Sequence, residues 1–584
     1  MHTGASTHRD KTAGSRQSVS AWLLMFALFL GAAIGLATSL TWVLSPTQSL
    51  LLALLPLACL AIPIMLTRPV YGFFLLVLLM PVEGIFLRAF EAEIKFYYLA
   101  AGALAIICLL ASMRRGRITY VRNVLTIPII FFYLVNAASI VYSPFKVDTL
   151  QYLMLFAFLL LIFFLVSFFV TDRKFYEQCV ILILLAGMAV SSLGILQLAL
   201  YRFAGLRLFV VLPSQELMLV NLSRISSLFH EADDLGAFLA YLVLLQVSLL
   251  ASRHTRHRAL LVAGIPLSGL ALVLSQTRAA LVGLGCGLCV LLFLLWIEGR
   301  TVLLRRLVQA LGLVLVSVLV LALVSPGVYQ SFAYRATRLL ATQSINPITG
   351  LANPSSTSPR ILTIRHMVSQ VSSSPSRALL GVGFGTWEQL AMELREEGGP
   401  ENNVLLSRGG ASLPVTAYYD AGVAGLFSVS LIFLVYVGSH LRALSMVRDG
   451  PWRAYLNASL CSFVGLFASL LLSNYFFLGV VWLQLGLGAQ LVGLAVEQQA
   501  RGGVRASTAH RSVTFESNKR TTRLQDGRSC ARRLRPIVTW ATYHGSRLLC
   551  APRKLAPEDS HPPLNETRAR VRPATGQPAG DSRQ

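Results

Sequence analysis

Charged side chains are scarce in this chain. Of its 584 residues only 13% are Asp, Glu, Lys or Arg, whereas 55% are hydrophobic. Because soluble globular proteins carry about 25% charged residues, this composition excludes an ordinary soluble protein. The apolar runs are continuous, without the two-residue alternation of barrel strands, and they recur from residue 20 to residue 495. We therefore predict an all-α, polytopic transmembrane helical bundle of about 12–14 spans, with one long extracytoplasmic loop domain near its C-terminal end.

Cysteine is also rare. The chain has eight cysteines, and none lies between residues 326 and 412, which excludes a disulfide within that stretch. Cys286 and Cys289 have a CxxC spacing, but they lie in an apolar run among glycines. That setting favours close helix packing over a metal or redox pair.

Acidic residues are few relative to basic ones. The chain has 26 Asp and Glu against 50 Lys and Arg, a net charge of +24. The basic residues cluster between the apolar runs and in the tail, as membrane topology requires, so we expect no nucleic-acid partner. With both termini in the cytoplasm, every short basic loop lies inside. Three regions then face outside: residues 202–234, the turn at Arg278 and residues 325–412.

The apolar pattern divides the chain into five segments. We predict a cytoplasmic N-terminal segment at 1–19, a transmembrane bundle at 20–325, a large periplasmic loop or cap at 326–412, C-terminal transmembrane helices at 413–497, and a basic, disordered cytoplasmic tail at 498–584. The long loop contains apolar clusters, so we expect short helices within it. The predicted spans are 20–43, 48–67, 70–90, 97–113, 124–142, 150–171, 176–201, 235–252, 259–276, 279–297, 305–325, 413–438, 455–472 and 474–495.

Four outward-facing stretches carry polar side chains that suit chemistry, although each is ambiguous by itself. Arg278, in LSQTRAAL, is either an interfacial anchor or a ligand contact. His230 beside Glu231 reads most simply as a surface pair. The glycines of GVGFG, at Gly383 and Gly385 among them, lack the strand and helix of a nucleotide fingerprint, so a tight turn with close backbone approach is expected.

Taken in chain order, these stretches resemble a known family. The pattern RxSSLFxxxDDLG at 224–236, then QTRAAL at 276–281, then an arginine at 360 followed by GVGFG, then YxDAGVAGL at 418–426, is similar to the O-antigen ligase and Wzy-type polymerase superfamily. The resemblance covers roughly residues 200–440. It implies a bacterial inner-membrane glycosyltransferase of the inverting, metal-independent kind, involved in lipopolysaccharide or exopolysaccharide synthesis.

The resemblance also implies a substrate and site residues. The donor would be a glycan linked to undecaprenyl pyrophosphate, and the acceptor a glycan or a lipid, with polysaccharide export machinery as a further partner. Arg224, Arg278 and Arg360 would hold the pyrophosphate, since a guanidinium fork matches phosphate oxygens. No cofactor or metal is expected. The acidic group at Glu231, Asp233 and Asp234 is interpreted as a helix cap or loop end rather than a divalent-ion site.

One position departs from the family pattern. Family members carry a His-Asn pair before the YxDAG span, and here Ala411 and Ser412 occupy the corresponding positions. Neither residue is a general base at neutral pH. Either Glu401, Asp420 or another carboxylate replaces the histidine, or the reaction needs no strong base, or activity has been lost. His230 and His366 lie further away in the sequence, and we name Arg278, Glu401 and Asp420 as the catalytic candidates.

Two other classes of function fit the composition. A polysaccharide or solute transporter or flippase also needs many spans, and a non-catalytic assembly component is a third reading. Charges buried in mid-span would favour transport. Glu83 is the clearest such residue, and we expect it to be interfacial, near the outer edge of its span.

Overall fold

The computed structural model describes the chain in several stretches within its first compact unit, Met1–His510. The described residues are 65–84, 86–89, 92–115, 123–204, 225–229, 231–252, 257–305, 307–309, 343–345, 352–354, 357–397, 411–447, 450–474 and 476–499. The predicted span 20–43, nearly all of 48–67, most of 305–325 and nearly all of the predicted tail therefore lie outside the described residues. The second unit, Arg511–Gln584, lies wholly outside them.

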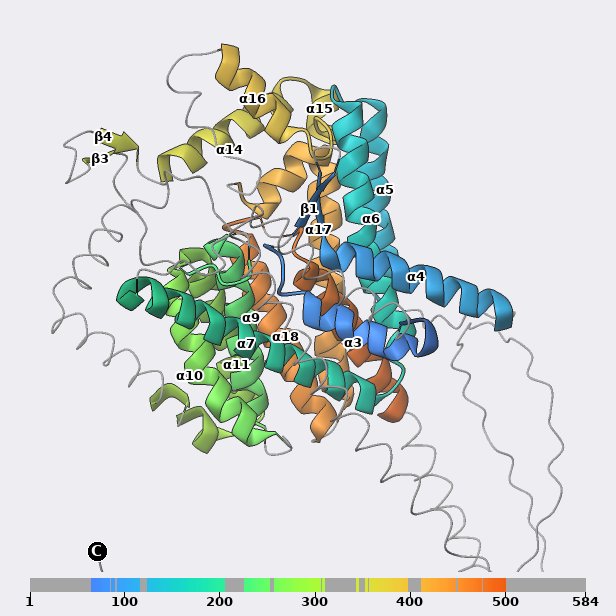
Figure 1. The fold of residues 1–584 in the computed structure, drawn as a ribbon, viewed down its shortest axis with the longest axis vertical. Helices are drawn as coiled ribbons and strands as arrows, with labels where there is room; N and C mark the ends of the chain where they lie inside the picture. The colour runs from blue at the N-terminus through green and yellow to red at the C-terminus, as the bar shows by residue number, and fades with distance from the viewer. Residues whose placement is uncertain are drawn as a thin grey trace, which may run out of the picture. The chain divides into compact units, whose positions relative to one another are not determined.

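Helices dominate the described part (Figure 1). Eight of them, within the described residues, are long and apolar enough to cross a membrane. The prediction of a polytopic helical bundle is confirmed at this level. The helices are α3 (Pro69–Leu79), α4 (Phe96–Arg115), α5 (Thr126–Ala138), α6 (Lys146–Phe169), α7 (Arg173–Ala204), α9 (Ala232–Leu250), α10 (Arg258–Ser275), α11 (Arg278–Ile297), α14 (Thr357–Ser372), α15 (Pro375–Leu380), α16 (Trp387–Glu397), α17 (Leu413–Met446), α18 (Pro451–Leu470) and a last described helix, Gly479–Gln499.

Two helices form the centre of the packing. The last described helix and α9 are the most buried of the eight candidate spans, and α9 packs against α10, α11 and α18 (Figure 1). Small residues allow the closest approach: a Cβ on Gly283 of α11 would lie 2.3 Å from the carbonyl oxygen of Gly465 on α18. This confirms the prediction that the glycines around Cys286 serve close helix packing.

One predicted span is shorter than expected. The apolar run predicts a span over 70–90, but α3 ends at Leu79, just before Pro81, which has no N–H for a further helical turn. An antiparallel ribbon follows instead, with β1 (Phe86–Ala89) paired to β2 (Ala92–Lys95). A second short ribbon pairs β3 (Gln343–Ile345) with β4 (Ala352–Pro354).

The stretch 357–397 contains three helices, α14, α15 and α16. They share a separate apolar cluster with the start of α17, which includes Met367, Trp387 and Tyr419, each fully buried. Two polar contacts fasten α16 to α6: the Tyr152 hydroxyl donates to Glu388 at 2.7 Å, and Gln389 donates to Asp148 at 2.9 Å. Short helices were expected here, and whether they form a periplasmic cap stays a prediction.

The long helix α17 is broken near its start. Ala421 and Gly422 have non-helical dihedral angles, and Gly422 lies at φ 61° and ψ −149°. At 1.5 Å per residue the whole helix is about 51 Å long, and the part after Gly422 is about 36 Å. The part after Gly422 is therefore long enough by itself to span a hydrocarbon core of about 30 Å.

Candidate functional site

The turn that carries Arg278 is a two-residue helical hairpin. α10 ends at Ser275, Gln276 takes a left-handed conformation at φ 54°, and α11 begins at Arg278. The prediction that Arg278 marks a boundary between two helices is confirmed. Its side chain is exposed at the first position of α11. A helix N-terminus carries partial positive charge, so this arginine adds to a region that already favours anions.

The residue before Arg278 ties this hairpin to the start of α9. The Thr277 hydroxyl lies 2.9 Å from the Ala232 carbonyl oxygen and 3.2 Å from Asp233 Oδ1. Gly236, one turn further along α9, permits this approach, because a Cβ there would lie 2.4 Å from Thr277 Cβ. The N-termini of α9 and α11 are therefore held side by side.

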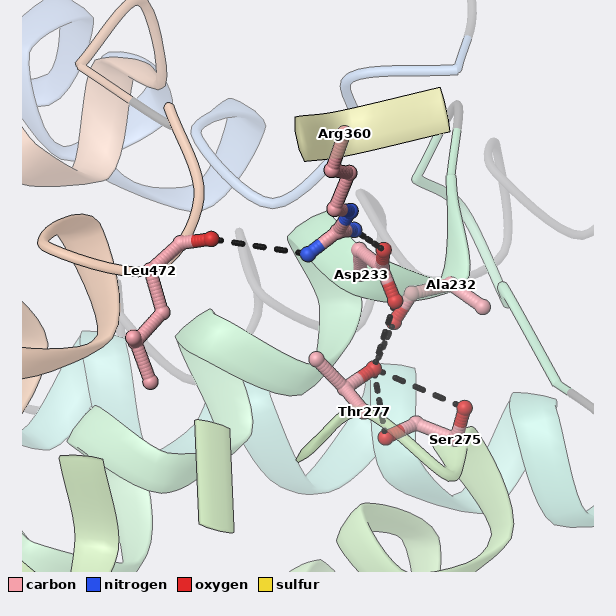
Figure 2. Close-up of polar contacts among 6 residues, drawn as sticks. All are labelled: Ala232, Asp233, Ser275, Thr277, Arg360 and Leu472. Carbon is pink, nitrogen blue, oxygen red and sulfur yellow. Dashed lines mark hydrogen bonds and ion pairs between the residues drawn. The ribbon is translucent and has the colours of Figure 1, made fainter. Parts of the chain in front are cut away.

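Arg360 reaches the same place from α14. Its Nη2 lies 3.5 Å from Asp233 Oδ2, and its Nη1 lies 3.4 Å from the carbonyl oxygen of Leu472, just past the end of α18. Figure 2 shows the guanidinium between these two acceptors, with Thr277 on the other side of Asp233. The start of α9, the α10–α11 hairpin, the start of α14 and the residues after α18 thus meet at one place. The hairpin carries Arg278 and α14 carries Arg360, which are two of the predicted arginines.

A buried ion pair lies close to Asp234. Glu83 is fully buried: its Oε2 lies 3.0 Å from Lys95 Nζ, and its Oε1 accepts from the Tyr97 hydroxyl at 3.0 Å and from the Gly479 N–H at 3.2 Å. Glu83 and Lys95 both interact electrostatically with Asp234. Burial lowers the pKa of Lys95, but attraction to Glu83 and other groups outweighs it, and the net direction is upward.

Glu83 was expected near the outer edge of its span, and its depth in the membrane stays a prediction. Within the protein it is fully buried, because the β1–β2 ribbon returns Lys95 to it and the last described helix supplies a backbone donor. The sequence gives little indication of the Glu83–Lys95 pair, because a single lysine before an apolar helix is typical of the boundary of a span. Lys95 and Thr277 are the two residues near this junction that the sequence reasoning missed.

A second junction joins the GVGFG turn to the break in α17. The N–H of Val382 donates to the Tyr419 carbonyl at 2.8 Å, and the N–H of Gly385 donates to Asp420 Oδ1 at 3.3 Å. Gly383 and Gly385 have positive φ values of 144° and 80°. The expected tight turn with close backbone approach is confirmed.

Asp420 is a structural part of this second junction. Its side chain is only 2% exposed, and its carboxylate accepts from the backbone of the turn. Tyr142 lies nearby and donates its hydroxyl to the Leu380 carbonyl. Burial raises the pKa of Tyr142 to about 12, and the negative charge of Asp420 acts in the same direction. This environment suits a residue that holds the backbone rather than one that meets a substrate.

Three predicted site residues, Arg224, His230 and Glu401, lie outside the described residues. Their placement stays a prediction. Ile225, which follows Arg224 in the sequence, donates its N–H to the Leu274 carbonyl oxygen at 3.3 Å, close to the hairpin. Within the part of the chain that the structure describes, no group of three or more His, Cys, Asp or Glu side chains is placed to hold a metal ion.

Three described basic residues of the predicted cytoplasmic loops, Arg173, Arg300 and Arg453, lie at the opposite ends of their helices. Glu298, just after α11, binds Arg453 of α18 at 2.7 Å and Arg300 at 2.9 Å. The guanidinium of Arg173, at the start of α7, lies 6.0 Å from the Trp452 ring centre. α11 begins at Arg278 and ends beside Glu298, whereas α18 begins near Arg453 and ends just before Leu472. Arg278 and Arg360 therefore lie at the far end of these helices from the predicted cytoplasmic loops, as the predicted topology requires.

No protein-family model matches the chain, and no curated protein matches its sequence. The chain is a multi-pass helical protein with apolar spans.

Proposed function

We propose that this protein is a membrane glycosyltransferase of the O-antigen ligase and polymerase type. It transfers a glycan from an undecaprenyl-pyrophosphate carrier to a sugar or lipid acceptor at the periplasmic face of the bacterial inner membrane. The observation that carries the proposal is the contact of Arg360 with Asp233, beside the hairpin of Thr277 and Arg278.

The chemistry of that junction supports a diphosphate ligand. Breaking the bond between the anomeric carbon and the pyrophosphate develops negative charge on the leaving group, and fixed guanidinium groups stabilise it. The Asp233 carboxylate now accepts from Arg360, and a phosphate oxygen is the same kind of acceptor. The N-termini of α9 and α11 contribute further positive potential at the same point.

Binding of a polyprenyl diphosphate tests the proposal directly. Full-length protein in lipid nanodiscs is titrated with geranylgeranyl pyrophosphate, and with geranylgeraniol as the uncharged control. Each charged hydrogen bond is worth about 1.5–3 kcal/mol, so Arg360→Ala and Arg278→Ala should each weaken binding by roughly 10- to 100-fold. The matched control is Arg377→Ala, which removes an exposed arginine of α15 that bonds to Ser373.

Glycan analysis separates the two reactions of this type. The gene is deleted in the bacterium that carries it, and surface glycans are separated on a gel after rescue with wild type, Arg278→Ala or Arg278→Lys. Loss of a polymerase leaves single repeat units on the acceptor, whereas loss of a ligase leaves glycan on the carrier. Normal glycans in the deletion strain would reject the transferase.

A transporter is the second candidate, because two observations favour it. Glu83 is fully buried, and α17 is broken at Gly422, as substrate-binding helices of transporters often are. Against this, the part of α17 after the break is long enough to span by itself, and Glu83 is paired with Lys95. Flipping of a fluorescent lipid-linked oligosaccharide in proteoliposomes, with no glycosidic bond formed, would establish the transporter instead.

A further inference from the structure

Thr277 is the N-cap residue of α11, but its side chain does not cap that helix. A threonine at an N-cap ordinarily accepts a hydrogen bond from a backbone N–H of the first helical turn. Here the side chain accepts none from that turn. It is buried, and its hydroxyl donates to the Ala232 carbonyl oxygen at 2.9 Å, with Asp233 Oδ1 at 3.2 Å as a second acceptor. Helix capping therefore does not account for a threonine at this position.

Gly236 shows that α9 is adapted to this contact. A Cβ at Gly236 would lie 2.4 Å from Thr277 Cβ and 2.5 Å from Thr277 Oγ1, far inside van der Waals contact. Gly236 lies within α9 and is not among the glycines with positive φ, so its backbone conformation does not require glycine. Its missing side chain makes room for Thr277. Two residues on different helices thus serve a single contact.

This contact lies between the two predicted diphosphate-binding arginines that the structure describes. Arg278 follows Thr277 in the chain, and Arg360 binds the other oxygen of Asp233, with 3.5 Å between Nη2 and Oδ2. Figure 2 shows Thr277, Asp233 and Arg360 in that order. Arg278 belongs to α11 and Arg360 to α14, so their spacing depends on contacts between helices. The Thr277 hydroxyl and the Asp233 carboxylate link the segments that carry them.

The spacing of two guanidinium groups matters more for a diphosphate than for a single phosphate. The phosphoryl groups of a diphosphate share one bridging oxygen, so two guanidinium groups can bind both of them only at a matching separation. A monophosphate can bind one guanidinium group alone, and its affinity depends less on that separation. We infer that Thr277 is a positioning residue that makes the site selective for a diphosphate, an inference that rests on the proposed function.

Thr277→Val tests this inference, because valine keeps the branched shape of threonine and changes no charge. Full-length protein in nanodiscs is titrated with geranylgeranyl pyrophosphate and with geranylgeranyl monophosphate. The diphosphate affinity of the valine variant should fall by roughly 10-fold, as one charged hydrogen bond is weakened, whereas its monophosphate affinity should stay within about threefold of wild type. Thr277→Ser, which keeps the hydroxyl, should retain the wild-type ratio of the two affinities.

Gly236→Ala breaks the same contact from the side of α9. A Cβ there must displace Thr277, so this variant should lose diphosphate selectivity as Thr277→Val does. Because both substitutions act on one contact, the double variant should lose little more selectivity than either single variant. The matched control is Gly269→Ala on α10, where a Cβ meets nothing within 4 Å, and it should leave both affinities unchanged.

The outcomes separate the inference from the proposed function. If Thr277→Val keeps the wild-type ratio of diphosphate to monophosphate affinity, or weakens both ligands equally, Thr277 only packs two helices together and the inference is overturned. Where Thr277→Val does not fold, the same criteria apply to Gly236→Ala. Wild-type protein that binds both phosphates equally would overturn the inference alone. Wild-type protein that binds the diphosphate no more tightly than uncharged geranylgeraniol would overturn the proposed function as well.

Discussion

The break in α17 gives the sharpest test of the backbone geometry. Gly422 lies at φ 61° and ψ −149°, a region that is essentially restricted to glycine and costs other residues about 1–3 kcal/mol. A Cβ there would also lie 2.4 Å from the carbonyl carbon and 2.5 Å from the carbonyl oxygen of Leu379. Because these are backbone atoms of α15, the helices must shift, at a further cost of about 1–3 kcal/mol. Gly422→Ala should therefore destabilise the protein by about 2–6 kcal/mol.

Gly438 provides a control on the same helix. A Cβ there meets nothing within 4 Å, so Gly438→Ala should be neutral or stabilise by up to about 1 kcal/mol. Both variants are compared with wild type by thermal unfolding in nanodiscs, followed through tryptophan fluorescence. The reasoning fails if Gly422→Ala unfolds at or above the wild-type midpoint while Gly438→Ala unfolds at or near it.

Two further predictions concern charge. Glu83→Ala should destabilise the protein by about 3–5 kcal/mol because it leaves Lys95 without its buried partner. In a double-mutant cycle measured by chemical unfolding, adding Lys95→Met to Glu83→Ala should recover part of that loss. If the effects of the two substitutions on the free energy of unfolding simply add, the ion pair is contradicted. Burial raises the pKa of Tyr142 from its ordinary 10.0 to about 12. Between these two pH values the phenol of the unfolded chain has lost its proton, whereas the phenol of the folded chain keeps it. The free energy of unfolding therefore falls as the pH rises. Tyr142→Phe should make the fall in the unfolding midpoint between pH 10 and about 12 shallower, and an unchanged slope would exclude Tyr142 as its source.

Local features of the candidate site could be predicted from the sequence. The hairpin at Arg278 was predicted because a guanidinium is costly inside the bilayer and must lie where an apolar run ends. The turn at Gly383 and Gly385 was predicted because alternating glycines permit positive φ angles and close backbone contact. Both signals depend on a few adjacent residues, and the structure confirms both.

Contacts between distant segments could not be predicted in this way. Arg360 and Asp233 are separated by 127 residues, and Glu83 and Gly479 by 396. Asp420 was chosen as a catalytic candidate for its position in the YxDAG stretch, but its contact with the backbone of Gly385 depends on how α15 meets the break in α17. Hydropathy gives the same score to a carboxylate that binds a turn and to one that meets a substrate.

The sequence by itself determined that the chain folds as a bundle of apolar helices, because a chain with so few charges can satisfy its backbone in a membrane only through internal hydrogen bonds. It also determined where polar residues interrupt those helices. Only the tertiary structure decided which interruptions meet: it brought Arg360 to Asp233, buried Glu83 against Lys95, and engaged Asp420 with the backbone of Gly385. The physical reason is that helix packing, which depends on side-chain shape along whole helices, sets the distance between groups that are far apart in the chain.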